Sequence, residues 1–116
     1  MTDRELLTLA ATAAGIGIIG PIGRYAAHHS PQHFDGLIVQ DSAGRRVRWN
    51  PLTSKADAFD LMVALEIDVR NFNGKSHAGK HNQFWCTEAW FLDADPLAAT
   101  RRAIVRAAAE IGRSKT

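Results

Sequence analysis

The stretch DPLAATRRAIVRAAAEIG, residues 95–112, carries the strongest secondary-structure signal in the chain. Asp95 is a favourable N-cap residue, and Pro96 suits the first helical position. One stripe of the expected helix carries apolar side chains at helical spacing, namely Leu97, Ile104, Ala108 and Ile111. Gly112 is expected to end the helix. The stretch therefore predicts an amphipathic helix.

Two capping boxes upstream predict two further helices, because a Ser or Thr followed three residues later by an acidic residue satisfies the first free N–H groups. Thr2 and Glu5 begin a helix over residues 3–14. Ser54 and Asp57 begin a second helix that runs through about Leu65. One face of that second helix carries Ala56, Phe59, Met62 and Val63.

Strand-forming segments lie between the expected helices. Leu37–Val39 and Val47–Trp49 are β-prone and flank the turn-forming residues 41–44, so they predict a hairpin. The segment before this hairpin is rich in glycine and proline. It therefore allows short strands at most, at Ile16–Ile19 and Ile22–Ala26, with a turn at Gly20-Pro21.

A second hairpin is predicted from the β-prone residues 67–72 and 83–91, joined by a polar, glycine-bearing loop over residues 73–82. Hairpins join neighbouring strands directly, so the order of the elements favours an antiparallel or mixed sheet. We expect a single α+β domain over residues 1–116. Its sheet of about four to six strands is expected to pack with three helices as a layered sandwich.

Composition excludes several classes of protein. The chain has 14 Lys and Arg against 12 Asp and Glu, and a net charge of +2 is too mild to indicate a nucleic-acid partner. Its 116 residues are too few for a multi-domain enzyme. The apolar residues 6–19 are too short to span a bilayer and lack the basic leader of a secretory signal. We therefore expect a cytoplasmic protein with no membrane partner.

Two glycine motifs resemble nucleotide-binding loops without their structural setting. GIGIIG, residues 15–20, follows an expected helix, whereas the dinucleotide fingerprint leaves a strand and opens a helix, so no nicotinamide cofactor is expected. GKSHAGK, residues 74–80, matches most of a phosphate-binding loop, but His81 replaces the magnesium-binding Ser or Thr. Two alternatives remain open for this segment: a solvated hairpin loop, or a flexible cationic loop that grips a phosphate without hydrolysing it.

The histidines form two groups that could share a metal ion in principle. The members are His28, His29 and His33 in one group and His77 and His81 in the other. No cysteine pair accompanies them, so surface histidines are expected, with a metal-dependent enzyme as the alternative. The single cysteine, Cys86, is expected to be a small buried core thiol. We assign no catalytic residue, metal ligand or cofactor.

Basic side chains are the candidate binding residues for a ligand or partner. They are Arg46, Arg48, Lys75, His77, Lys80, His81, Arg102 and Arg106. If the basic groups converge with Trp49, Trp85 or Trp90, they form a surface suited to a protein partner or a stacked nucleotide. The alternative is that these three tryptophans belong to the core.

Parts of the chain resemble small uncharacterised phage and prophage proteins, and more loosely the phage ABA-sandwich family. The similar segments are WNPLT at residues 49–53, the following helix with Asp57-Ala58, and DPLAATRRAI at residues 95–104. The resemblance implies a layered α/β sandwich, expression inside an infected bacterium and no established enzymatic activity.

From these observations we expect a phage-encoded, non-enzymatic binding protein in the host bacterial cytoplasm. It would act in counter-defence by sequestering a host nucleotide signal or by masking a host protein. A small hydrolase or metal-dependent enzyme that uses the histidines is the alternative, and a structural or assembly component is a third hypothesis. A homo-oligomer is also open.

Overall fold

The computed structural model describes residues 1–22, 35–80, 83–90 and 95–115, and these have an α+β fold. The helices are α1 (Asp3–Ala14), α3 (Lys55–Ala64) and α4 (Pro96–Ser114). The strands are β1 (Gly17–Pro21), β2 (Leu37–Gln40), β3 (Arg46–Trp49), β4 (Asp68–Phe72), β5 (Lys75–Lys80) and β6 (Phe84–Ala89). Within the described ranges, no helix is both long and apolar enough to cross a membrane.

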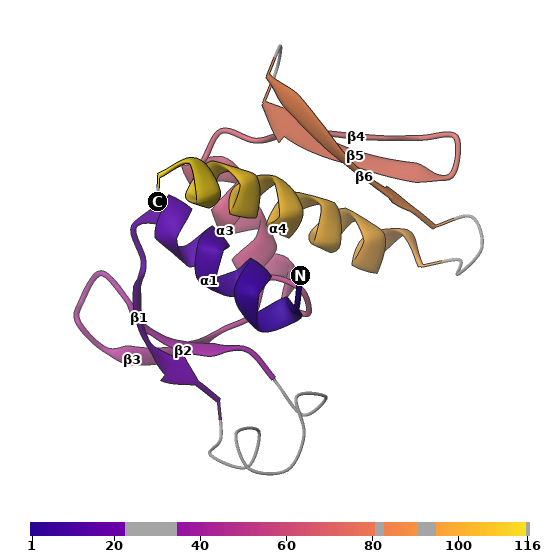
Figure 1. The fold of residues 1–116 in the computed structure, drawn as a ribbon. Coiled ribbons are helices and arrows are strands. Elements are labelled where there is room, and N and C mark those ends of the chain that lie inside the picture. The colour runs from indigo at the N-terminus through magenta and orange to yellow at the C-terminus, as the bar shows by residue number, and fades with distance from the viewer. Residues whose placement is uncertain (23–34, 81–82, 91–94, 116) are drawn as a thin grey trace.

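The strands form two antiparallel sheets, with the helices between them (Figure 1). The first sheet contains β1, β2 and β3, and the second contains β4, β5 and β6, each in chain order. The expectation of one larger sheet is therefore wrong. Within the described ranges, each strand pairs with its neighbours along the chain, and α3 connects the last strand of the first sheet to the first strand of the second.

α1 and α4 pack side by side and form the centre of the core (Figure 1). The predicted ends of α1 are confirmed: Thr2 Oγ1 accepts the Glu5 N–H at 3.2 Å, and Gly15 adopts a left-handed φ of +71°. α4 continues past Gly112, so the prediction that this glycine ends the helix is wrong. Gly112 is buried, and a Cβ there would collide with the Leu9 carbonyl. The glycine lets the two helix backbones approach closely.

The WNPLT segment holds the corner between β3 and α3. Trp49 is buried in the core. For this tryptophan, the alternative of a core position is confirmed. The Asn50 side-chain oxygen accepts the Leu52 N–H at 3.0 Å, and the Asn50 N–H donates to Asp57 at 2.9 Å. Arg101 of α4 donates to the Leu52 carbonyl at 2.8 Å. These polar groups are used within the fold.

Two details of the first half of the chain differ from prediction. Gly20-Pro21 lies inside β1, where a register shift between Ile18 and Gly20 accommodates it, so the predicted turn at this dipeptide is wrong. α3 begins after its predicted cap, Ser54, but buries Ala58 and Leu61. The predicted apolar face, with Ala56, Phe59, Met62 and Val63, points largely to solvent, because α3 packs on α4 through a narrower stripe.

The segment predicted as a polar loop, residues 73–82, contains β5, the central strand of the second sheet. Asn73 and Gly74 form the two-residue turn that precedes it, with φ of +54° and +70°. Ser76 and Ala78 are fully buried on β5. The small size and polarity of these residues hid an alternating strand pattern. The prediction that Lys75 and Lys80 lie in a loop, whether solvated or flexible, is therefore wrong, because Lys75–Lys80 form a strand.

Candidate functional site

The predicted binding residues lie in three places and do not form one site. Those in the described ranges are Arg46 and Arg48 on β3, Lys75, His77 and Lys80 on β5, and Arg102 and Arg106 on α4. His81 lies outside the described residues, as do His28, His29 and His33. The β5 residues and the α4 arginines both belong to the half of the molecule around the second sheet.

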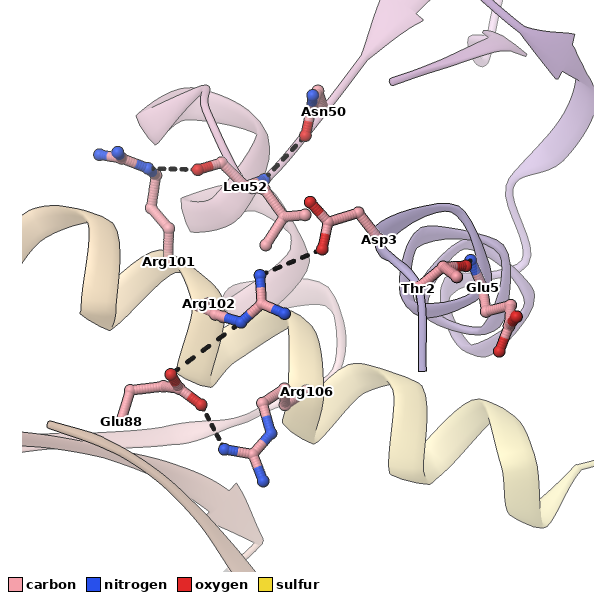
Figure 2. Close-up of polar contacts among 9 residues, drawn as sticks. All are labelled: Thr2, Asp3, Glu5, Asn50, Leu52, Glu88, Arg101, Arg102 and Arg106. Atoms are coloured by element: carbon pink, nitrogen blue, oxygen red, sulfur yellow. Dashed lines mark hydrogen bonds and ion pairs between the residues drawn. The ribbon is translucent and has the colours of Figure 1, made fainter. Parts of the chain in front are cut away.

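Arg102 and Arg106 point toward Glu88 of β6 and are paired there (Figure 2). Arg106 forms a hydrogen-bonded ion pair with Glu88 and also donates to the Thr87 carbonyl at 2.9 Å. Arg102 lies 4.0 Å from the second Glu88 oxygen and donates to Asp3 of α1 at 3.1 Å. Two cations therefore meet two carboxylates. This network ties α4 to α1 and β6, and its positive charge is already balanced.

A hollow of about 390 Å³ opens beside this network, and Cys86 is among the residues that line it. Cys86 is 7% exposed, which confirms the prediction of a buried core thiol. Burial raises the pKa of the Cys86 thiol, and the positive charge of Arg106 opposes this only in part. The thiol is therefore protonated at neutral pH, and no histidine lines the described part of the hollow. A thiol in this form is a weak nucleophile, because the thiolate is the reactive species.

The inner face of the second sheet packs on α4, and its buried polar side chains pair with one another. Ser76 is fully buried, and its Oγ lies 2.8 Å from Thr100 Oγ1 of α4. Thr100 Oγ1 in turn lies 3.0 Å from the Asn71 side-chain oxygen on β4. Ala78 and Cys86 fill the space beside these groups. The inner face therefore serves the fold.

The outer face of the second sheet points away from α4, and no described helix or strand lies over it (Figure 1). Alternation along the strands and the cross-strand register assign its members. Its charged and ring-bearing side chains are Asp68, Arg70, Phe72, Lys75, His77 and Trp85. Aromatic and cationic side chains therefore gather on a sheet face that the described part of the fold leaves open.

The first ring group on the outer face combines Phe72 and His77. Their rings stack with centroids 4.8 Å apart and planes inclined by 26°. His77 Nδ1 shares a hydrogen bond with Thr87 Oγ1 at 3.0 Å, which fixes the imidazole on the sheet. Phe72 is nevertheless 51% exposed. Lys75 is its register partner on β5, so the side chains of Phe72 and Lys75 leave the sheet as neighbours on the same face.

The second ring group combines Arg70 and Trp85. The guanidinium carbon of Arg70 lies 5.4 Å from the centroid of the Trp85 ring, within the range of a cation–π contact. Trp85 is 40% exposed. Its register partner is Gly79, which has no side chain to separate the two groups. An aromatic ring and a cation are therefore adjacent a second time on the same face.

Sequence reasoning found Lys75 and His77 but assigned no binding role to Arg70 or Phe72. Trp85 was predicted as a possible part of a basic and aromatic surface, but its pairing with Arg70 was not predicted. The missed signal is the dipeptide Asn73-Gly74, which is typical of a two-residue hairpin turn. Recognising that turn would have placed β5 beside β4, and alternation would then have brought these side chains to one face.

Comparison with known proteins adds no relative. No protein-family model, curated protein or solved structure matches the chain. The chain is therefore assigned to no family, and the resemblance to small phage proteins stays a prediction. Any functional conclusion rests on the residues of the second sheet and their geometry.

Proposed function

We propose that the chain is a non-enzymatic binding protein that recognises a nucleotide-type ligand through the outer face of the second sheet. The observation that carries this proposal is that each exposed ring has a cationic neighbour on the same face: Arg70 contacts the Trp85 ring, and Lys75 is the cross-strand neighbour of Phe72. A nucleotide base stacks on an aromatic ring, and its phosphate attracts a guanidinium or ammonium group. Each pairing therefore matches the two chemical parts of a nucleotide.

The size of the outer face favours a small ligand over the other predicted partner, a host protein. Three strands of this length span roughly 10–15 Å across and 20 Å along, which is roughly 300 Å². A stable protein interface buries about 800 Å² on each partner. The outer face alone is too small for such an interface, whereas a stacked ligand needs only a ring and a nearby cation.

The non-enzymatic part of the proposal is supported by the surroundings of Cys86 and the α4 arginines. The thiol is held in its protonated form, and Arg102 and Arg106 are committed to Glu88 and Asp3. Of the two predicted counter-defence roles, this proposal favours sequestration over masking a host protein. The protein would hold a host nucleotide signal and release it unchanged.

Calorimetric titration of the purified chain with linear and cyclic nucleotides tests the proposal. Binding should weaken about 5- to 150-fold when Trp85→Leu and Phe72→Leu are combined in one chain, because base stacking contributes about 1–3 kcal/mol per ring and either ring alone can still hold a base. Ligand released by heating should be recovered intact. Recovery of an altered product would instead support the enzyme alternative.

Matched variants separate this effect from a general loss of exposed side chains. Phe59→Leu removes a phenylalanine that is 60% exposed on α3, and Arg48→Gln removes an exposed arginine of the first sheet. Both should bind nucleotides like the unmodified chain. Equal losses in these controls, or no binding of any nucleotide, would refute the proposal.

A further inference from the structure

The two ring groups of the outer face stand at opposite corners of the second sheet. Phe72 pairs in register with Lys75, and Trp85 pairs with Gly79. These pairs are four residues apart along β5, and the two rings belong to the two strands on either side of it. Their Cα atoms are therefore on the order of 16 Å apart. A single base covers one ring and leaves the other unused.

Cationic side chains lie between and beside the two rings. Arg70 is the register partner of His77, near the middle of the face, and it extends over Trp85. Lys75 lies at the Phe72 corner. The carboxylate of the face, Asp68, lies in the Trp85 row, opposite Gly79. An anionic backbone is therefore favoured along the side that carries Arg70 and Lys75.

We infer that the outer face binds single-stranded nucleic acid, with one base on Phe72, a second on Trp85 and the connecting phosphates beside Arg70 and Lys75. This inference rests on the proposed function and narrows its ligand to a chain of at least two nucleotides. Double-stranded nucleic acid does not fit, because its bases are already stacked on one another and offer no free face to a side chain.

Arg70 takes part in this binding, because its guanidinium lies over the face of the Trp85 ring on which the second base would stack. A base that stacks on Trp85 displaces the guanidinium from the ring face, and the guanidinium is then free to pair with a phosphate. The mild net charge of +2 argued against a nucleic-acid partner. Recognition by stacking removes that objection, since the affinity comes from two rings and needs few phosphate contacts.

Fluorescence anisotropy with a labelled eight-nucleotide oligothymidylate tests the inference. Unlabelled competitors are thymidine monophosphate, the unlabelled eight-mer, a duplex of the same length and inorganic polyphosphate. The single-stranded eight-mer should bind at least about 20-fold tighter than the monophosphate, which exceeds the statistical factor of its eight bases. Duplex and polyphosphate should compete weakly, because neither offers an unstacked base.

Single-corner variants show whether both rings act together. Phe72→Leu or Trp85→Leu should each remove most of the gain from monophosphate to eight-mer, whereas the control Phe59→Leu should keep it. Equal affinity for monophosphate and eight-mer would overturn the inference and leave the proposed function standing. Equal competition by the duplex or by polyphosphate would also overturn it. Failure of every nucleotide to bind would refute both.

Discussion

The inner and outer faces of the second sheet share the same three strands but use their side chains in opposite ways. On the inner face, Ser76 reaches Thr100, and Glu88 meets the arginines of α4. No described helix or strand lies over the outer face (Figure 1), where Phe72 and Trp85 are 51% and 40% exposed. The polar side chains of the inner face bond to other residues of the fold, while the rings of the outer face are exposed to solvent.

The contrast indicates where substitutions should be costly. Alternation sends neighbouring residues of a strand to opposite faces, so stability and recognition are carried by interleaved positions. Substitutions of inner residues should change the free energy of unfolding, and substitutions of outer residues should change binding. Pairs of identical residues on the two faces give the sharpest test of this division.

The largest effect is expected at Ala78, which is fully buried on β5 against α4. Ala78→Leu adds three carbon atoms to a packed site, and overpacking of this kind costs about 1–3 kcal/mol. The matched change is Ala89→Leu on β6, where the alanine is exposed and faces outward. That change should stay within about 0.5 kcal/mol of the unmodified chain.

Urea unfolding followed by circular dichroism measures both alanine variants. A lower midpoint for Ala78→Leu with an unchanged slope is the expected result. If Ala89→Leu destabilised the chain as much as Ala78→Leu, the outer face would have to be packed, and the division between the two faces would be wrong.

A smaller effect is expected from the ion pairs of the inner face. Glu88→Gln removes the carboxylate that Arg102 and Arg106 share, and it should lower the free energy of unfolding by about 1–2 kcal/mol. These side chains are only partly buried, so solvent screening limits the loss. Glu110→Gln is the control, because Glu110 meets Arg113 at 3.4 Å with both side chains well exposed. It should change stability by less than about 0.5 kcal/mol.

Added salt distinguishes electrostatic from packing effects in this pair of variants. The difference between the unmodified chain and Glu88→Gln should shrink at 1 M salt, where the Debye length is about 3 Å. A difference that does not depend on salt would mean that the substitution acts through packing, and that the arginines are held in place by their neighbours.

Local signals in the sequence were sufficient for the helices and the first hairpin. The caps Thr2, Ser54 and Asp95 begin α1, α3 and α4 as predicted, because a cap acts on N–H groups within three residues. The β-prone segments around residues 37–40 and 46–49 pair as predicted. In each case, the residues that make the structure are neighbours in the chain.

Tertiary contacts decided what sequence reasoning missed. Gly112 was predicted to end a helix, but it lies inside α4, where the lack of a side chain lets the backbone of α1 pack closely. α1 is far from Gly112 in the sequence. Phe59 and Val63 of α3 had an apolar pattern yet stay exposed, since α4 covers another side of that helix. The outer face depends on the pairing of β4, β5 and β6, and the polar composition of β5 concealed that pairing.

The smallest effect concerns the pH dependence of the inner face through Cys86. An unfolded thiol titrates near pH 8.5, and burial raises the pKa of Cys86 in the folded chain. Above pH 8 the folded state therefore holds the proton longer than the unfolded state, so stability falls as the pH rises through this window. Urea unfolding at neutral pH and at about pH 9.5 should show this loss in the unmodified chain and a smaller loss in Cys86→Ala, because all other titrating groups are common to both.

Alkylation with iodoacetamide near pH 8 should also be much slower for the folded chain than for the chain in urea, since the thiolate is the reactive form. Equal alkylation rates would mean that the thiol is open to solvent, and the inner face would then not be the closed side of the sheet.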